Sequence, residues 1–168
     1  MSLTMYTATV PTCTRALNNL AAILEKAAAH AEARKIAPAV LLNSRLFPDM
    51  FPLATQIHIA NDIAQGGAAR LAGAEVPAFE AKERSIAEWI ATSRATIAYL
   101  EALNPAQFDG AEDRTITWQT RSTTRNMQGT AYLFHHVLPN VFFHVTTAYD
   151  ILRQAGLELG KLDYLGRT

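Results

Sequence analysis

Four segments of about 20 residues, in each of which apolar residues recur every three or four positions, limit most strongly what this chain can fold into. This spacing predicts helices at about 12–35, 52–72, 81–103 and 130–155. Each helix would carry one apolar stripe, and four such stripes are most economically buried against one another. A chain of 168 residues is long enough for one hydrophobic core. The sequence therefore predicts an all-α four-helix bundle that forms a single domain over residues 1–168.

Residues that often start or end helices support these boundaries. Pro38 follows the first segment, and Pro52 suits the first turn of the second. Gly73 follows the second segment, Pro105 follows the third, and Gly156 closes the last, as a glycine does at many helix C-termini. Alanine, the residue with the highest helix propensity, is concentrated in the first hundred residues. These signals favour helix most clearly in the first three segments.

Three connecting or terminal segments are expected to carry structure of their own. Residues 39–50 contain several leucine and phenylalanine side chains, so we expect this connector to pack back onto the bundle. Polar and apolar residues alternate over 114–120, which predicts a short β-strand, and residues 124–128 are its expected partner in a β-hairpin before the last helix. The tail after residue 156 also contains apolar side chains, and we expect part of it to be docked.

Composition excludes several classes of protein. Lys plus Arg and Asp plus Glu each total 15, so the formal net charge of +0 gives no bulk attraction to nucleic acid or to an anionic membrane. No apolar run approaches the roughly 18 residues of a membrane helix. The single cysteine, Cys13, excludes an intramolecular disulfide and suits a reducing compartment, so we interpret the chain as cytoplasmic. Residues 1–3 precede a second methionine, Met5, and we interpret them as a leader added for expression.

The last predicted helix carries a line of polar residues. His136, Asn140 and His144 are spaced i, i+4 and i+8, which places them on one side of the helix, along the inner edge of its apolar face. We call these three residues the polar row. Polar groups that face an interior cost free energy unless they are hydrogen-bonded or hold a ligand. The row is therefore either a structural network or a site, and Trp118 and Tyr149 could line a small-molecule pocket beside it.

Both interpretations of the row have support in the sequence. Pro139 removes a main-chain donor and clears space around the carbonyl of His135, four residues earlier, so the Asn140 amide could simply repair such a kink. The two histidines of the row are about 12 Å apart along the axis, too far for one ion to bind both. On the second helix, His58 and Asp62 are spaced i, i+4, either as an oriented imidazole or as a surface pair.

Several short segments together resemble one protein family. Residues 144–156 read H-V-T-T-A-Y-D-I-L-R-Q-A-G, and residues 58–60 of the second helix read H-I-A. Residues 46–53 read L-F-P-D-M-F-P-L, and residues 138–149 read L-P-N-V-F-F-H-V-T-T-A-Y. These segments are similar to the DinB/YfiT-like superfamily of four-helix bundles, and most closely to a branch known as a domain of unknown function. The resemblance covers most of the chain.

The resemblance implies a site for a divalent metal such as zinc or nickel. In the superfamily one histidine of helix two and two histidines at i, i+4 on helix four hold the ion, and some members are thiol-dependent transferases or isomerases. By position, His58 and His144 would be ligands, and Asn140 stands at the remaining ligand position. Because an asparagine carbonyl is a poorer ligand than imidazole for these metals, we expect the metal site to be degenerate or absent.

The sequence thus leaves three functional hypotheses. The first is a divalent-metal-dependent enzyme of the thiol transferase or isomerase type, with His58, Asn140 and His144 at the metal. The second is a non-catalytic bundle that forms a homodimer through an apolar helix face. The third is a protein that binds a small molecule at the polar row without a metal. None of the three involves nucleic acid or a membrane.

Overall fold

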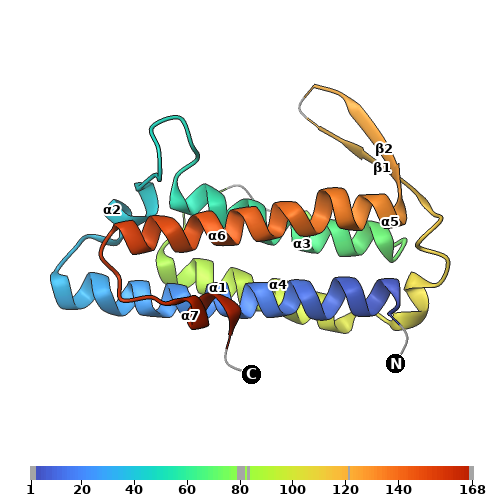
Figure 1. Ribbon diagram of the computed structural model, residues 1–168. Helices are drawn as coiled ribbons and strands as arrows, with labels where there is room; N and C mark the ends of the chain where they lie inside the picture. The colour runs from blue at the N-terminus through green and yellow to red at the C-terminus, as the bar shows by residue number, and fades with distance from the viewer. Residues whose placement is uncertain (1–2, 79–81, 83, 121, 167–168) are drawn as a thin grey trace.

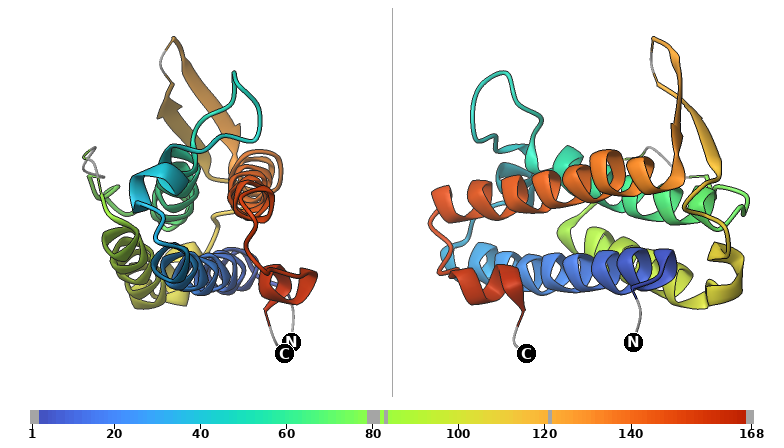
Figure 2. Two further views of the ribbon diagram at one scale, coloured as in Figure 1. Left: turned by 90° about the vertical axis from the view of Figure 1, so that its left-hand side faces the viewer. Right: turned by 45° about the vertical axis from the view of Figure 1, so that its right-hand side comes forward.

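The computed structural model describes residues 3–78, 82, 84–120 and 122–166. Its frame consists of four long helices, α1 (Met5–Arg34), α3 (Leu53–Leu71), α4 (Ile86–Ala102) and α6 (Leu138–Gln154). Figures 1 and 2 show α1 beside α4 in one layer and α3 beside α6 in the other. The predicted all-α bundle is confirmed.

Shorter elements connect and extend the four long helices. They are α2 (Pro38–Asn43), the 3-10 turn η1 (Pro105–Phe108), strands β1 (Thr115–Gln119) and β2 (Thr124–Gln128), α5 (Gly129–Tyr132), the π-helical turn η2 (Leu133–Val137) and α7 (Lys161–Leu165). The two strands pair antiparallel with Trp118 opposite Arg125, which confirms the predicted hairpin. Ile116 and Trp118 are the buried side chains of β1, so one face of the hairpin packs against the bundle.

Small residues of α3 bring this helix close to the last helical segment. Ala60, Ala64 and Ala68 are fully buried along one stripe of α3. A Cβ atom on Gly67 would lie 2.8 Å from the Val137 side chain, a separation that real Cβ atoms do not tolerate. The close approach of α3 and η2 therefore depends on glycine at this position. It also fixes α3 beside the helix that carries the polar row.

The first helix is longer than the sequence analysis predicted. It begins at Met5, not near residue 12, and Pro11 lies inside it. Thr4 caps the helix by accepting a hydrogen bond from the Thr7 amide, and Val10 is buried in the core. Capping and burial offset the one main-chain hydrogen bond that the proline cannot make. The predicted leader falls partly on residues 1–2, which lie outside the described residues.

Two other expectations need correction. The third long helix begins at Ile86, where Ser85 and Glu88 form a capping box, and the earlier start predicted at Ala81 lies outside the described residues. The connector between α1 and α3 is only half docked. Leu41 and Leu42 of α2 are buried, whereas Phe47 is 63% exposed. Some apolar residues of this connector therefore pack in the core, and others lie on the molecular surface.

The last helical segment is not one continuous α-helix. A π-helical turn, η2, separates α5 from α6 and ends just before Pro139. Proline has no amide hydrogen, so the ladder of main-chain hydrogen bonds is interrupted at this position. The interruption lies inside the segment that carries the polar row.

Candidate functional site

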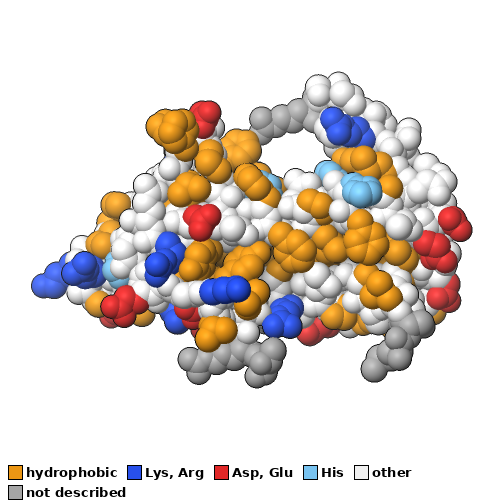
Figure 3. Space-filling view, in the orientation of Figure 1, with side chains coloured by type: hydrophobic (Ala, Val, Ile, Leu, Met, Phe, Trp, Pro, Cys, Tyr) orange, Lys and Arg blue, Asp and Glu red, His pale blue; other side chains and the backbone are white. Residues whose placement is uncertain are grey.

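The polar row runs between two parts of the chain that project from the same side of the bundle. Residues 44–52 and the hairpin both stand above α3 and α6 (Figure 1; Figure 2). Figure 3 shows the molecular surface hollowed between them. His144 is joined through Gln56 to Phe51 of the first projection, and His136 contacts Trp118 of the second. We call the surface of α3 and α6 between these two projections the saddle.

At one end of the row, a relay of hydrogen bonds fixes His144. Its Nδ1 atom lies 2.6 Å from Oε1 of Gln56, and Nε2 of Gln56 donates to the carbonyl oxygen of Phe51 at 3.0 Å. A main-chain carbonyl can only accept, so the Gln56 amide is oriented with its oxygen toward the histidine. The proton of a neutral His144 is therefore on Nδ1, and Nε2 carries the free lone pair. Burial lowers the pKa of His144 and so favours the neutral ring.

In the middle of the row, Asn140 repairs the main chain. Its Nδ2 atom donates a hydrogen bond of 2.6 Å to the carbonyl oxygen of His136, one turn earlier. This carbonyl lies at the junction of η2 and α6, beside Pro139. Only the Nδ2 atom of this amide is hydrogen-bonded, because no hydrogen bond from a described residue reaches its Oδ1 atom. Asn140 Oδ1 and His144 Nε2 are two acceptors one turn apart.

At the other end of the row, His136 belongs to an aromatic cluster. Its ring centroid is 4.7 Å from that of Trp118 in β1 and 5.3 Å from that of Tyr132 in α5. Trp118 and Tyr132 are themselves 4.8 Å apart, and Nη1 of Arg70 in α3 lies 3.4 Å from the Tyr132 hydroxyl. Burial lowers the pKa of His136, and the positive charges of Arg70 and Arg125 lower it further.

Two predicted site residues lie apart from this arrangement. The ring of His58 packs edge-on against Trp89 of α4, with centroids 6.1 Å apart, whereas Gln56 of the same helix reaches α6. Burial lowers the pKa of His58, Asp62 raises it and Arg84 lowers it. Tyr149 contacts Tyr164 of α7, with ring centroids 6.1 Å apart. The structure brings His136 and Trp118 together beside Asn140 and does not bring His58 or Tyr149 to them.

The donor atoms at the row do not fit a metal site of the kind that the family resemblance implies. Such a site takes three protein ligands, and α6 offers one imidazole nitrogen and one amide oxygen. Among residues 3–78, 82, 84–120 and 122–166, no group of three or more His, Cys, Asp or Glu side chains could hold an ion. The ligand set His58, Asn140 and His144 stays a prediction.

Two residues of this arrangement, Gln56 and Arg70, were not predicted from the sequence. Gln56 is 1% exposed and stands within the apolar stripe of α3, three residues after Leu53 and four before Ala60. A glutamine within an apolar stripe could have indicated a site, because a buried amide needs partners for all of its polar atoms. Arg70 had no such signal, because its contact with Tyr132 depends on how the hairpin and α5 are placed.

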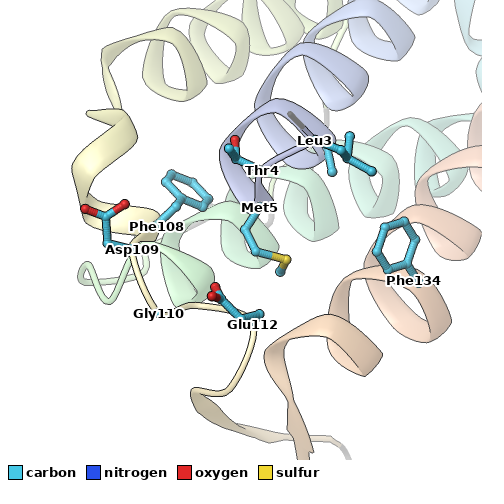
Figure 4. A pocket seen from close by; sticks show the side chains of 9 residues that line it. Leu3, Thr4, Met5, Phe108, Asp109, Gly110, Glu112 and Phe134 are labelled. Carbon is cyan, nitrogen blue, oxygen red and sulfur yellow. The ribbon is translucent and has the colours of Figure 1, made fainter. Parts of the chain in front are cut away.

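Cavities also lie outside the saddle, along the seam between α1 and α6. One, of about 450 Å³, lies where the start of α1 meets η1 and η2 (Figure 4). Its walls are apolar, with Met5, Phe108 and Phe134, and its rim is acidic, with Asp109 and Glu112. A second, of about 520 Å³, lies farther along the seam, where Tyr164 and Leu165 of α7 form part of its wall. The seam is therefore grooved and largely apolar.

Comparisons with known proteins agree with this architecture. The family model of DUF1993, described as a domain of unknown function, matches residues 5–165. The crystal structure of a DinB family member protein from Shewanella denitrificans is similar, with 41% sequence identity, a TM-score of 0.90, and coverage of 97% of this chain and 92% of that chain. No curated protein matches the chain. Among the described helices, none is both long and apolar enough to cross a membrane. The DinB-like fold predicted from the sequence is confirmed, and the chain belongs to the DUF1993 family.

Proposed function

We propose that this protein binds a small molecule on the saddle through two hydrogen-bond acceptors, Nε2 of His144 and Oδ1 of Asn140. The ligand carries a donor group, such as an amine or a hydroxyl, and binding needs no metal ion. The protein is in this sense a DinB-like bundle in which the metal site implied by the resemblance to the DinB/YfiT-like superfamily is degenerate or absent.

The observation that carries this proposal is the relay from His144 through Gln56 to Phe51. It places the proton on Nδ1 and leaves the lone pair on Nε2, in a side chain that is 8% exposed. No described residue hydrogen-bonds Nε2, and this atom is not among the buried polar atoms that lack a partner, so it stays accessible to a ligand donor. Phe143, 55% exposed and edge-on to the His144 ring, adds apolar surface for the rest of the ligand.

Binding is tested with three small probes of similar shape. Phenol and benzylamine carry a donor, and toluene is the matched control that carries none. We expect phenol or benzylamine, but not toluene, to shift the ¹⁵N resonance of His144 Nε2 in a saturable way, while the resonances of His30 on α1 stay unchanged. Equal effects of all three probes, or none on His144, would contradict the proposal.

The metal-dependent alternative is tested at Asn140. Asn140→His would give α6 the i, i+4 histidine pair that the family resemblance implies. We expect this variant to bind Zn²⁺ or Ni²⁺ at least about tenfold more tightly than the wild type, because imidazole is the better ligand. Asn140→Gln is the matched control and should gain nothing. Stoichiometric metal in the untagged wild type that is lost in His144→Ala would favour the thiol transferase or isomerase alternative instead.

We also propose that the partner at the α1/α6 seam is a second copy of this chain. Phe134, Phe142 and Leu165 are 40–43% exposed along this seam, where Figure 3 shows a band of apolar side chains. Apolar patches of this kind often mark protein interfaces.

The charges around the band are consistent with a two-fold arrangement. Asp109 and Glu112 lie at one end of the seam, and Arg15 and Lys161 lie toward the other. Antiparallel packing of two copies about a two-fold axis would bring these opposite charges together.

Light scattering tests this association. We expect a dimer of the wild type and a monomer of Phe142→Ser, because Phe142 lines the groove of the seam. Phe143→Ser, on the saddle side of α6, is the matched control and should remain a dimer. A monomeric wild type would contradict the proposal.

We also propose a cytoplasmic location. This proposal is supported by the single cysteine, Cys13, which is buried as a free thiol.

A further inference from the structure

Two arginines from distant parts of the sequence, Arg70 and Arg125, both act on His136 at the hairpin end of the saddle. Arg70 comes from the last turn of α3, and its Nη1 atom lies 3.4 Å from the Tyr132 hydroxyl. A Cβ atom on Gly66 would lie 2.8 Å from the same Nη1 atom, so the Arg70 side chain folds back along α3. Glycine at this position leaves room for the guanidinium beside the aromatic cluster.

Arg125 reaches the same place from the hairpin. It stands directly opposite Trp118 in the antiparallel pair, and cross-strand partners project from the same face of a sheet. Trp118 stacks on His136, so the face that carries Arg125 is the face turned toward α6. Arg125 is exposed at its position in β2, which leaves its guanidinium accessible. The lowering of the His136 pKa by burial, Arg70 and Arg125 is consistent with this placement.

The positive charges of this group lack a carboxylate partner. Within the part of the chain that the structure describes, no ion pair involves Arg70 or Arg125, whereas Arg94 pairs with Glu25 and Lys26 pairs with Asp163. Burial raises the pKa of Tyr132, Arg70 lowers it through its charge and its hydrogen bond, and Asp62 raises it by a smaller effect. Figure 3 shows a basic side chain and histidine side chains at the hairpin, with no acidic side chain between them on that face.

We propose that Arg70, Arg125 and His136 form a binding site for an oxyanion, the carboxylate or phosphate group of the ligand that occupies the saddle. The planar guanidinium group has several N–H donors in a geometry that matches both anions, and the single 3.4 Å bond of Arg70 leaves most of its donors free. The ring nitrogens of His136 have no hydrogen bond to a described residue and can supply another donor.

The anion site would make the saddle selective for one class of small molecule. His136 and Asn140 are one turn apart, about 6 Å along the helix axis. A ligand of this class has an oxyanion at one end and an amine or hydroxyl at the other, within the length of a few covalent bonds. This identification of the ligand class rests on the proposed function, whereas the anion site can be tested by itself.

The test is a titration of the full chain with sodium phosphate and, separately, with sodium acetate, at ionic strength held constant with sodium chloride. The indole N–H resonance of Trp118 reports binding, and that of Trp89, a buried residue of α4 that packs edge-on against His58, is the internal control. We expect a saturable shift of Trp118 with at least one of the two anions. Phosphate as the tighter binder would identify a phosphate ester, and acetate as the tighter binder would identify a carboxylate.

Variants separate this site from nonspecific attraction. We expect Arg125→Gln and Arg70→Gln each to weaken anion binding at least about fivefold, because each removes a charge-assisted hydrogen bond. Arg94→Gln, which removes an exposed arginine of α4, is the matched control and should change nothing. Arg125→Gln decides the question even if Arg70→Gln is unstable, because Arg125 is exposed on a strand.

Two results would overturn the inference. One is the absence of saturable binding by either anion, and the other is binding of the same strength in Arg125→Gln. The outcome is independent of the probe experiment for the proposed function, which is read at the His144 ring. Saturable anion binding at Trp118, together with no response of His144 to phenol or benzylamine, would therefore refute the acceptor pair and leave the oxyanion site intact.

Discussion

The two ends of the polar row lie on one helix and share one residue type, yet they are built in opposite ways. At the His144 end, the side-chain amide of Gln56 hydrogen-bonds the imidazole and is itself held by the main-chain carbonyl of Phe51. The His144 ring is buried. At the His136 end, no described residue hydrogen-bonds the ring, and its position is set by stacking on Trp118 and Tyr132. One end is therefore an oriented acceptor, and the other is an aromatic platform beside two cations.

The difference shows that the spacing of polar residues on a helix does not define their chemistry. Their neighbours come from residues 44–56 at one end and from the hairpin at the other. Asn140 lies between the two ends and supports the main chain beside Pro139, whereas His136 itself belongs to the π-helical turn. Each end can therefore be altered without removing the other.

The largest effect is expected at the aromatic end. Trp118→Ala should lower the free energy of unfolding by about 3 kcal/mol, because Trp118 is a large buried side chain whose loss leaves a cavity. The His144 ring should keep its tautomer in this variant, as read from its ¹⁵N shifts. Chemical denaturation measures the stability loss, and Trp118→Phe should lose clearly less. A change at His144 as large as that at His136 would mean that the two ends are not separate.

A smaller effect is expected at the hydrogen-bonded end. Gln56→Leu preserves much of the volume but leaves the His144 Nδ1–H group and the Phe51 carbonyl without their partner. We expect a loss of about 2 kcal/mol in the free energy of unfolding, the cost of unsatisfied buried polar groups. The double variant Gln56→Leu/His144→Leu should recover part of this loss, because both partners are then apolar. Additive losses in a double-mutant cycle would contradict the relay.

Asn140, in the middle of the polar row, should contribute less to the free energy of unfolding than either end. Asn140→Ala removes one hydrogen bond, the donor to the His136 carbonyl, and we expect a loss of about 1 kcal/mol. Asn140→Asp is the informative companion, because a carboxylate at neutral pH cannot donate to that carbonyl and should be at least as destabilising. Thermal unfolding of both variants measures the effect. A stability equal to that of the wild type would show that Asn140 does not support the helix at Pro139.

A gradual effect is expected from pH. His58, His136 and His144 all have a pKa lowered from the ordinary value of 6.5, with burial as the largest cause. The unfolded chain therefore binds more protons than the folded one below pH 6.5, and stability should decrease as the pH falls from 7 through 6.5. Denaturation midpoints measured over this range test the sign. His136→Gln should reduce the pH dependence, and a stability that rises on acidification would contradict the assignment.

Much of the fold was predictable from the sequence because it depends on local patterns. The apolar periodicity of α3, α4 and α6 predicted the bundle, and alternation over 114–120 predicted the hairpin. The start of α1 was not predictable in the same way, because Pro11 is tolerated through burial of neighbouring residues. The shared face of the polar row also followed from periodicity.

The partners of the row depend on contacts between distant segments. The sequence indicated that the Asn140 amide could repair a kink at the carbonyl of His135, and the structure shows its hydrogen bond at the carbonyl of His136 instead. The pairing of His144 with Gln56 spans 88 positions, and the proximity of Arg125 to His136 requires both the register of the hairpin and the docking of Trp118. No local pattern encodes either contact. The chemistry of the site therefore became visible only with the packing of α3 and the hairpin against α6.

The central claim is that His144 presents a free lone pair on Nε2 to the saddle. Long-range ¹H–¹⁵N NMR of the histidine rings at neutral pH measures this directly in the free protein. The account predicts a neutral His144 ring with its proton on Nδ1, and a shift toward the other tautomer in Gln56→Leu, where the Gln56 acceptor is gone. A proton on Nε2 of the wild type, or a charged ring at that pH, would contradict it.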